Sequence, residues 1–493
     1  MALFKDQTFK YYFVTVLVST LILFRPISDP DFGWHYKYGQ YFVQNHVIKL
    51  DANTFSYNLA DYHWANSYWL AEVFFYVVYS IHPALPSITT SFALAIVMYL
   101  QLRDKKYNVV GGILAISLVT LISTLVSISV RPMIFSNIFL LILINVLTYH
   151  IKYLKSLPIL FLVWANTHAD FVLGLGIYGL YTALHIFMEV KSGLEMRKYK
   201  EMMLQIFYKS FWGITSVVVT ILNPYGLNLF STLFNETQSS QFKHISEWMP
   251  VLHNYNLNKP LELITIIFAY SIIITAVVGQ RKKVDAWLLI SIIVSMALSF
   301  KSIYFARIAI VLAIYPVALF WGTVATKIPK YIHIENKKIL KVFSLYMYTI
   351  LFLATTGLSL RTLSTYVSKE AFCKFTRYPC GAVNYIKTTK PQGNMFNNYN
   401  WGGYLIMNLP EYKTFIDGRM PSWKYSNTYI YDDYINITKY PEESRELFNT
   451  YAQEHNITWI FDYKESKLAK YLIETGNWES VYKDDVAIVA IKK

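Results

Sequence analysis

The sequence is poor in charge for its length. Asp, Glu, Lys and Arg make up only 15% of its 493 residues, whereas 54% are hydrophobic and the mean hydropathy is +0.31. Soluble domains carry roughly 25% charged residues, so this balance excludes an ordinary soluble enzyme and indicates a membrane protein. The formal net charge is +14. Because the basic residues cluster in short loops between apolar runs, this charge indicates orientation in a membrane rather than binding to nucleic acid.

Cysteine is nearly absent as well. The two cysteines, Cys373 and Cys380, lie in the segment CKFTRYPC, where too few further ligands are near for a metal site. We expect this segment to lie outside the cytoplasm, where a disulfide can persist, although two reduced thiols are the alternative. The first apolar run, residues 11–27, lacks a small-residue cleavage site, so we expect a retained span and not a cleaved signal peptide.

Long apolar runs recur through the first three quarters of the chain. A membrane-spanning helix needs roughly 20 predominantly apolar residues. The candidate segments are 11–27, 66–81, 85–102, 109–129, 132–150, 157–168, 170–190, 206–222, 261–279, 284–300, 303–325 and 339–360. The basic loops between them, which the positive-inside rule places in the cytoplasm, are RDKK (103–106), KYLK (152–155), KSGLEMRKYK (191–200), RKK (281–283) and KIPKYIHIENKK (327–338).

The alternation of these loops leaves one apolar segment too many. The basic N-terminus is expected in the cytoplasm and residues 28–65 outside, so an odd number of crossings must separate them from the first basic loop. Two candidates stand there, and we expect 66–81 not to cross. It is short, and it carries Glu72, Tyr76 and Ser80 at helical spacing, which is typical of a helix that lies in the membrane interface. A true span with one misassigned loop is the alternative.

The expected fold class is therefore an α-helical polytopic membrane protein of about 11 transmembrane helices with a C-terminal soluble α/β domain. Residues 1–364 would form the transmembrane domain, with a large first external loop at 28–84 and a second at about 223–260. Residues 365–493 would form an extracytoplasmic domain. Its expected strands are NMFNNY, KTFIDGR, ITWIFDY, WESVYKDD and VAIVAIKK, and its expected helices are WGGYLIMNL, EESRELFNTYAQEH and SKLAKYLIET.

Several motifs together resemble the GT-C superfamily of polytopic membrane glycosyltransferases, which includes the protein O-mannosyltransferases. They are DPDFGWH, YWLAE, RPMIFS, WANTHADFVLG, LNPYG, SEWMP and NNYNWGGYLIMNLP…FIDGR. Their order is similar to that in a poorly characterised prokaryotic group of the superfamily, and the resemblance covers most of the chain. The chain departs from the pattern in THAD, where Asp170 stands in place of His-Gly-Gly or similar residues. The resemblance implies transfer of a sugar from a polyprenyl-phosphate carrier to an extracytoplasmic protein, lipid or glycan.

The resemblance also implies a general base in the first external loop. Transfer to a hydroxyl needs a group that takes the proton of the acceptor. In the superfamily an acidic residue of this loop has that role, which falls here on Asp31 or Asp29. We favour Asp31, because it adjoins the aromatic FGWH, and a helix N-cap is its alternative role. His35 can orient the base or bind phosphate, or be a plain interfacial residue, and Glu72 is a second acidic candidate or part of a solvated face.

Three basic residues near external span ends are candidates for the phosphate of the donor: Arg131, Arg307 and Lys301. A guanidinium can hold a phosphate through paired hydrogen bonds, whereas snorkelling to lipid headgroups is the alternative. Arg307 lies inside an apolar run, where a charge is costly and is usually functional or paired.

Four further residues are candidates for substrate binding: His168, Asp170, Glu247 and Trp248. The first two lie where two short apolar helices meet outside, which indicates a cavity wall. His168 and Asp170 can also ligate a divalent metal together with Asp31, so a metal is left open although the sequence requires no cofactor. For Asp417 and Arg419 in FIDGR we favour a turn with an internal ion pair over acceptor binding.

Two other functions compete with glycosyl transfer. A lipid or polysaccharide transporter or flippase would need charges midway through its spans and paired or interrupted repeats. Here the charges gather at external ends and no repeat is evident. A non-catalytic envelope assembly protein would not need acidic and histidine residues that converge on one side. The expected location is the cell membrane, with several passes, a cytoplasmic N-terminus and an extracytoplasmic C-terminal domain.

Overall fold

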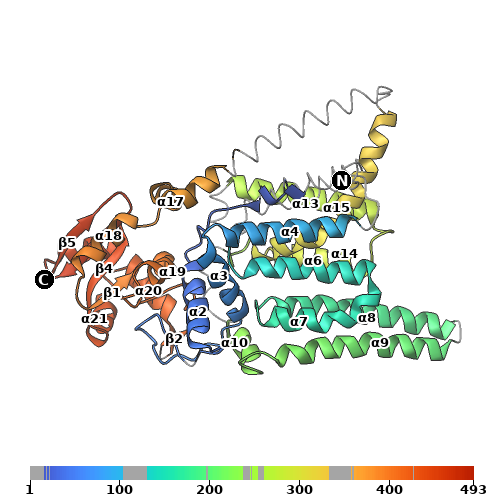
Figure 1. Cartoon of the computed structure of the whole chain (residues 1–493), viewed down its shortest axis with the longest axis horizontal. Helices are drawn as coiled ribbons and strands as arrows, with labels where there is room; N and C mark the ends of the chain where they lie inside the picture. Colours follow the sequence, from blue (N-terminus) through green and yellow to red (C-terminus); the bar gives the residue numbers. More distant parts are fainter. Residues whose placement is uncertain are drawn as a thin grey trace. The chain divides into compact units, whose positions relative to one another are not determined.

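The structure, a computed structural model, describes most of the chain. The described residues are 16–17, 19–21, 23–50, 52–103, 130–195, 198–236, 245, 247–253, 260–331, 357, 360–425 and 427–493. The chain divides into two compact units (Figure 1). The helical unit comprises Met1–Pro26, Ala84–Asn223 and His244–Leu363, and the mixed unit comprises Ile27–Pro83, Pro224–Lys243 and Ser364–Lys493.

The helical unit consists of apolar helices joined by short loops. Its described helices are α4 (Leu85–Arg103), α6 (Met133–Tyr149), η2 (Ile151–Ser156), α7 (Leu157–Ala165), α8 (Phe171–Glu195), α9 (Tyr199–Val218), η3 (Val219–Ile221), α13 (Pro260–Gln280), α14 (Ala286–Leu298) and α15 (Tyr304–Tyr331). Every apolar run that the sequence predicts within the described part of this unit forms a helix. The predicted span at 109–129 lies outside the described residues, as does that at 339–360 except for residues 357 and 360. Of the predicted span at 11–27, residues 11–15, 18 and 22 lie outside them.

Length and hydropathy mark these helices as membrane-spanning candidates. Among the described residues, four helical segments are long and apolar enough to cross a bilayer: Phe171–Glu195, Tyr199–Ile221, Leu263–Gln280 and Tyr304–Val324. On α9, Phe207 is 68% exposed and Ile214 65% exposed, which suits a helix that faces lipid. On α15, Ala306, Ala309 and Ala313 are fully buried, and such small side chains let neighbouring helices approach closely. The helical unit therefore has the character of a membrane protein.

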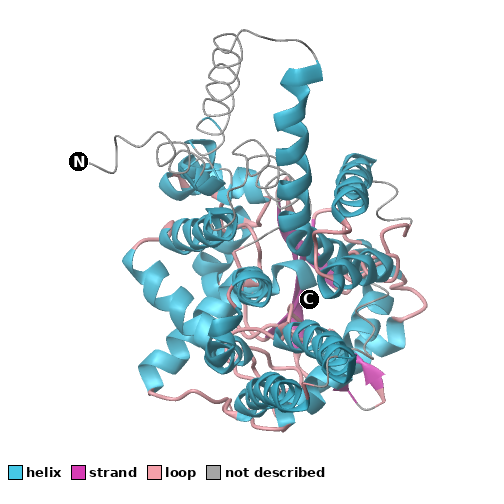
Figure 2. Cartoon of the chain, turned by 90° about the vertical axis from the view of Figure 1, so that its right-hand side faces the viewer, coloured by secondary structure: helices cyan, strands magenta, loops and turns pink. Residues whose placement is uncertain are grey.

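The mixed unit joins short helices to a small sheet. Its helices are α2 (Phe32–Asn45), α3 (Trp69–Ile81), α10 (Asn228–Glu236), α17 (Lys369–Thr376), α18 (Cys380–Thr389), η4 (Tyr399–Trp401), α19 (Gly402–Asn408), α20 (Ile430–Lys439), α21 (Arg445–Glu454) and α22 (Lys467–Glu474). Its strands, magenta in Figure 2, are β1 (Asn394–Asn397), β2 (Lys424–Tyr425), β3 (Thr428–Tyr429), β4 (Ile457–Tyr463), β5 (Trp478–Lys483) and β6 (Ala487–Lys492).

Four of the strands form one sheet in the order β1-β4-β6-β5. Strand β1 runs parallel to β4, while β4 and β5 run antiparallel to β6. Met395 pairs with Trp459 in the register of β1 and β4, and both side chains are buried with Phe461 and Val489 in one apolar core. The predicted C-terminal α/β fold is thus confirmed.

One predicted strand of this domain is wrong. The segment KTFIDGR, residues 413–419, is a loop, and only Thr414 makes an isolated bridge, to Ser56 of residues 28–84, called the first loop from here on. The backbone of the segment forms hydrogen bonds with that loop. The Tyr57 N–H donates to the Thr414 carbonyl (3.2 Å), and the Thr414 N–H donates to the Phe55 carbonyl (3.0 Å). Its hydrogen bonds therefore join the C-terminal segment to the first loop.

The first loop belongs to the mixed unit, and its backbone touches the C-terminal segment directly. Helix α2 packs against both α3 and α19. A Cβ atom on Gly33 would lie 1.9 Å from the Gly403 carbonyl oxygen, and one on Gly403 would lie 2.1 Å from the Pro30 carbonyl oxygen. Only glycine at these two positions allows such a close approach, which explains the glycines in FGWH and WGGY.

The orientation of α3 relative to the membrane is open to a direct test. We expect a cysteine in place of the exposed Pro83 to react with a membrane-impermeant maleimide in intact cells, because 66–81 is predicted not to cross. The two native cysteines are disulfide-bonded and do not compete for the reagent. The matched control is a cysteine in place of Lys282, which is exposed and predicted to be cytoplasmic. Labelling at position 83 only after permeabilisation would restore α3 as a span.

Candidate functional site

The acidic pair at the start of the mixed unit is held by its own backbone and by an indole. Asp29 Oδ1 accepts a hydrogen bond from the Asp31 N–H (3.0 Å), and Asp31 Oδ1 accepts one from Trp34 Nε1 (3.1 Å). Asp31 occupies the N-cap position of α2, but its side chain makes no capping hydrogen bond. The alternative role of Asp31 as a side-chain cap is therefore wrong. A Cβ atom on Gly418 would lie 1.9 Å from Asp31 Oδ1, so the glycine of FIDGR leaves room for this carboxylate.

His35 and Glu72 form a buried pair between α2 and α3. His35 Nδ1 lies 3.0 Å from Glu72 Oε1, and Asn66 Nδ2 donates to Glu72 Oε2 at 2.6 Å. His35 is 3% exposed and Glu72 fully buried, so the alternative of a solvated face for Glu72 is wrong. Burial raises the pKa of Glu72 well above its usual value, and the hydrogen bond from Asn66 offsets this only in part. The pair fixes α2 against α3 beside the acidic pair.

Asp417 and Arg419 form the ion pair that the sequence favours, and it is entirely buried. Arg419 Nη2 lies 2.6 Å from Asp417 Oδ2, and Arg419 Nε donates to Asp417 Oδ1 at 2.7 Å. The guanidinium also donates to the Tyr38 hydroxyl, to Asn53 Oδ1 (3.0 Å) and to Ser56 Oγ (2.9 Å). Every one of these hydrogen-bond partners outside FIDGR belongs to the first loop. The pair therefore joins that loop to the C-terminal segment and is part of the core.

In the helical unit, Arg307 is paired as a charge in an apolar run must be. Its Nη2 donates to Asp170 Oδ2 (3.1 Å), its Nη1 donates to Asn137 Oδ1 (2.9 Å), and its guanidinium lies over the Tyr304 ring, 4.6 Å from the centroid. Tyr304 also donates its hydroxyl proton to Asp170 Oδ1. Asp170 thus accepts hydrogen bonds from both Arg307 and Tyr304.

A second ion pair lies in the same unit. Arg131 Nη2 contacts both carboxylate oxygens of Glu247. Next to it, Trp248 stacks on Tyr304 with the ring centroids 4.8 Å apart and an interplanar angle of 13°. Since Tyr304 contacts Asp170, one connected cluster contains six of the predicted residues: Arg131, His168, Asp170, Glu247, Trp248 and Arg307. Lys301 is exposed on the surface.

The donors of this cluster are bonded within the chain. His168 Nδ1 lies 2.9 Å from Ser136 Oγ and 3.4 Å from Asp170 Oδ2. Within the described ranges, no group of three or more His, Cys, Asp or Glu side chains is arranged to hold a metal ion. The donor set that is described therefore does not fit the divalent metal that the sequence leaves open. Tyr304 and Asn137 are members of the cluster that sequence reasoning missed, although Tyr304 stands one helical turn before Arg307.

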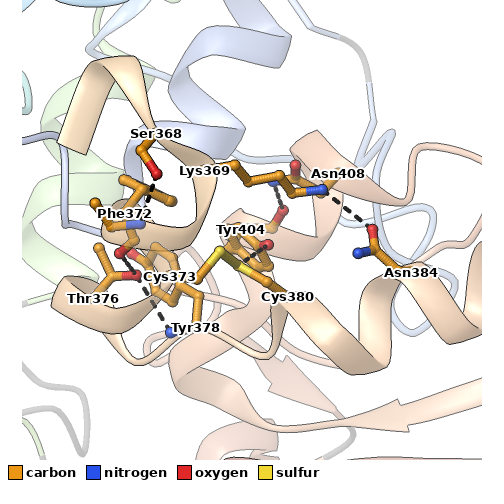
Figure 3. The surroundings of a disulfide bond; sticks show 11 residues. Ser368, Lys369, Phe372, Cys373, Thr376, Tyr378, Cys380, Asn384, Tyr404 and Asn408 are labelled. Carbon is orange, nitrogen blue, oxygen red and sulfur yellow. Dashed lines mark hydrogen bonds between the residues drawn. A yellow bond between two sulfur atoms is a disulfide. The ribbon is translucent and has the colours of Figure 1, made fainter. Parts of the chain in front are cut away.

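Cys373 and Cys380 form a disulfide, so the alternative of two reduced thiols is wrong (Figure 3). The bridge joins α17 to the start of α18. The Tyr404 hydroxyl donates to Cys380 Sγ (3.3 Å), and Lys369 Nζ donates to Asn384 Oδ1 (3.2 Å). The bridge therefore fixes the segment that carries Tyr378, whose hydroxyl donates to the Ser28 carbonyl of the first loop (2.7 Å).

A cavity of about 410 Å³ lies in the mixed unit beside this disulfide. Asp29 and Lys369 are the charged groups among the described residues that line it. Its aromatic walls are Phe32, Tyr79, Tyr366, Phe372, Tyr378 and Tyr404. Sequence reasoning identified Asp29 but missed Lys369 and the tyrosines. The two cysteines were the available signal, because they mark the segment that closes the cavity.

Of the comparisons with known proteins, only the one with solved structures gives matches. No family model matches the sequence, and no curated protein matches it. Among solved structures, the chain is similar to ArnT from Cupriavidus metallidurans in the apo state, with 11% identity and a TM-score of 0.49 over 98% of this chain and 97% of that chain. It is also similar to ArnT from the same organism bound to undecaprenyl phosphate, with 12% identity, a TM-score of 0.45 and the same coverage of 98% and 97%. At TM-scores below 0.5 this likeness carries no argument, so the function must be inferred from the residues of this chain.

Proposed function

We propose that the protein is a membrane glycosyltransferase that moves a sugar from a polyprenyl-phosphate carrier to an extracytoplasmic acceptor. The observation that carries the proposal is the acidic pair Asp29 and Asp31. It directly follows the first apolar segment, both side chains are half-buried, and Asp29 lines a cavity. A carboxylate at this place can reach a lipid-borne donor and a water-borne acceptor. The apolar helices and the GT-C-like motifs support the same function.

The reaction needs one base and one stabilised leaving group. The acceptor hydroxyl gives its proton to a carboxylate of the acidic pair while its oxygen forms a bond to the anomeric carbon of the sugar. The bond from that carbon to the phosphate oxygen breaks, and its electron pair leaves with the polyprenyl phosphate. Trp34 holds the Asp31 carboxylate, and the Asp31 N–H holds that of Asp29. Both candidate bases are therefore oriented before the acceptor binds.

The cluster around Arg131 and Arg307 supports the second requirement, which is stabilisation of the leaving phosphate. Negative charge develops on the phosphate as it leaves, and a guanidinium in a sheltered site stabilises such charge. Arg307 Nε is buried and has no hydrogen-bond partner in the part of the chain that the structure describes, so it can donate to a phosphate oxygen. The partner of Arg131 is more accessible, since the Glu247 side chain is 38% exposed. Arg131 can therefore exchange Glu247 for the donor phosphate.

If Arg131 exchanges Glu247 for the donor phosphate, replacing Arg131 and replacing Glu247 should change the affinity for polyprenyl phosphate in opposite directions. Arg131→Ala removes a charged donor, and a hydrogen bond to a charged group contributes roughly 1.5–3 kcal/mol, so affinity for polyprenyl phosphate should fall about 10- to 150-fold. Glu247→Gln removes the competing carboxylate and should raise that affinity. The measurement is the dissociation constant of polyprenyl phosphate for each purified variant in lipid nanodiscs. Arg307→Lys is the comparison, because it keeps the charge but loses the two-pronged geometry. Unchanged affinity in Arg131→Ala would mean that this arginine does not bind the donor phosphate.

The function itself is tested with a polyprenyl-phosphate sugar whose sugar is radiolabelled. Wild-type protein in nanodiscs should release polyprenyl phosphate and move the label to an acceptor. A flippase would instead move the intact labelled lipid between leaflets of a proteoliposome. Movement of the lipid with no release of polyprenyl phosphate would overturn the proposal in favour of transport.

A further inference from the structure

The cavity beside the disulfide is formed within the mixed unit alone. The start of the first loop contributes Asp29 and Phe32, the end of α3 contributes Tyr79, and α19 contributes Tyr404. The covalent loop from Cys373 to Cys380 supports another side of it. Its volume of about 410 Å³ falls within the roughly 300–1,000 Å³ of small-molecule sites. The cavity therefore has the size for a small ligand group.

Its walls combine aromatic faces with hydrogen-bonding groups. Tyr378 and Tyr404 stack with their ring centroids 4.3 Å apart, and Phe372 lies 5.8 Å from Tyr378. Burial, together with the charges of Asp29 and Asp31, raises the pKa of Tyr378, so this phenol stays protonated. It donates its proton to the Ser28 carbonyl, and its oxygen can accept a hydrogen bond from a ligand. A ligand in the cavity thus meets flat apolar faces and several polar atoms.

The charges of the cavity disfavour the donor phosphate as its occupant. A phosphate would face the carboxylate of Asp29, and the cavity offers one ammonium, Lys369, and no guanidinium among its described lining residues. A polyprenyl chain would shield both charged groups from water and offer them no polar atoms of its own, which is costly. A neutral ligand with an apolar face and many hydroxyl groups matches both kinds of wall.

A serine or threonine side chain of a protein acceptor also matches poorly. It would bring one hydroxyl to Asp29 but fill little of the cavity, and its contacts with the aromatic walls would be few. A pyranose ring presents a C–H face to an aromatic ring and hydroxyls around its edge. Those hydroxyls can donate to Asp29 and to the oxygens of Tyr378 and Tyr404, and they can accept from Lys369.

We propose that this cavity is the acceptor subsite and that it takes a neutral sugar residue of a glycan, with Asp29 as the carboxylate that receives the acceptor proton. The proposal rests on the proposed glycosyltransferase function and adds the class of the acceptor. The proton passes from a sugar hydroxyl to Asp29, and the new bond joins that sugar oxygen to the anomeric carbon of the donor sugar. Asp31 then acts as a positioning residue, because its N–H holds Asp29.

The test obstructs the cavity without touching the core. Val367 lines the cavity and is 83% exposed, so Val367→Trp adds bulk there with little risk to folding. The matched control is Ile48→Trp in the same unit, at a position that is 51% exposed and away from the lining residues. The acceptor probes are the p-nitrophenyl glycosides of glucose, galactose, mannose and N-acetylglucosamine, and a serine- and threonine-containing peptide. The donor is the radiolabelled polyprenyl-phosphate sugar.

We expect transfer to at least one glycoside and none to the peptide. Val367→Trp should lower kcat/KM for that glycoside by about tenfold or more and leave the Kd of polyprenyl phosphate at the value of the Ile48→Trp control. Transfer to the peptide, equal kcat/KM in the two variants, or release of polyprenyl phosphate without a glycoside product would each overturn the inference but leave the glycosyltransferase proposal standing. No release of polyprenyl phosphate with any probe would overturn the proposed function, and the inference with it.

Discussion

Asp29→Asn should lose most sugar transfer while the protein stays folded. The amide oxygen of asparagine can still accept the Asp31 N–H that Asp29 Oδ1 accepts, but it cannot take a proton from the acceptor hydroxyl. General base catalysis contributes roughly 10²–10⁴-fold to a rate, and we expect a loss of kcat of that size. The measurement is kcat for transfer together with the Kd of polyprenyl phosphate, which should not change.

Asp31→Asn is the matched comparison. Its amide oxygen can still accept the hydrogen bond from Trp34 Nε1, and the backbone N–H that orients Asp29 is kept. We therefore expect a smaller loss of kcat than in Asp29→Asn. A larger loss in Asp31→Asn would assign the base to Asp31, the residue that the sequence favours. Normal kcat in both variants would show that neither Asp29 nor Asp31 is the general base.

Asp417→Asn should prevent the mixed unit from folding stably. Arg419 would remain buried among Tyr38, Asn53 and Ser56 with its countercharge removed. Removing one partner of a buried ion pair costs roughly 3–5 kcal/mol, which is a large part of the 5–15 kcal/mol that stabilises a typical domain. The expected result is a low yield of folded protein and rapid proteolysis of residues 364–493 in limited digestion.

The double variant Asp417→Leu/Arg419→Met is the control, because apolar replacement of both charges is often near neutral. It should resist proteolysis better than Asp417→Asn does. Acid should act in the same direction. Burial opposes the charge on Asp417, but Arg419 outweighs burial and lowers the pKa of Asp417. A lowered pKa in the folded state gives stability that is present above the unfolded pKa of about 3.9 and is lost as the pH falls below it. A wild-type protein that is equally protease-resistant at pH 7 and pH 3 would contradict this.

The helices of the helical unit could be predicted because their signal is local. An apolar run of sufficient length is helical whatever packs against it, since only a helix satisfies its backbone within a bilayer. The boundaries of α6 and α8 accordingly lie near the predicted 132–150 and 170–190. Orientation relative to the membrane is not local in this sense, and it stays a prediction.

The partners of the charged residues could not be predicted, because they lie far along the chain. Glu72 stands on a polar stripe that indicates a solvated helix face. In the structure it pairs instead with His35, which lies 37 residues earlier in the chain. In FIDGR, the β-prone Phe415 and Ile416 predict a strand. The polar groups beside them bind Ser56 and Tyr38 instead, and tertiary contacts override the local preference. Arg131 likewise pairs with Glu247, 116 residues away.

The contacts between the first loop and FIDGR also affect how the protein folds during its synthesis. The Ser56–Thr414 and Ser56–Asp417 hydrogen bonds join residues 358 and 361 positions apart, and the Tyr38–Arg419 bond joins residues 381 apart. At a synthesis rate of 5–20 residues per second, the loop waits roughly 20–70 s for the segment that completes its core. Throughout that interval Tyr38 and Phe42, fully or almost fully buried in the finished molecule, have no C-terminal partner to cover them. A ribosome stalled before residue 413 would leave the first loop without FIDGR, so the loop completes its core only after residues 413–419 have been made.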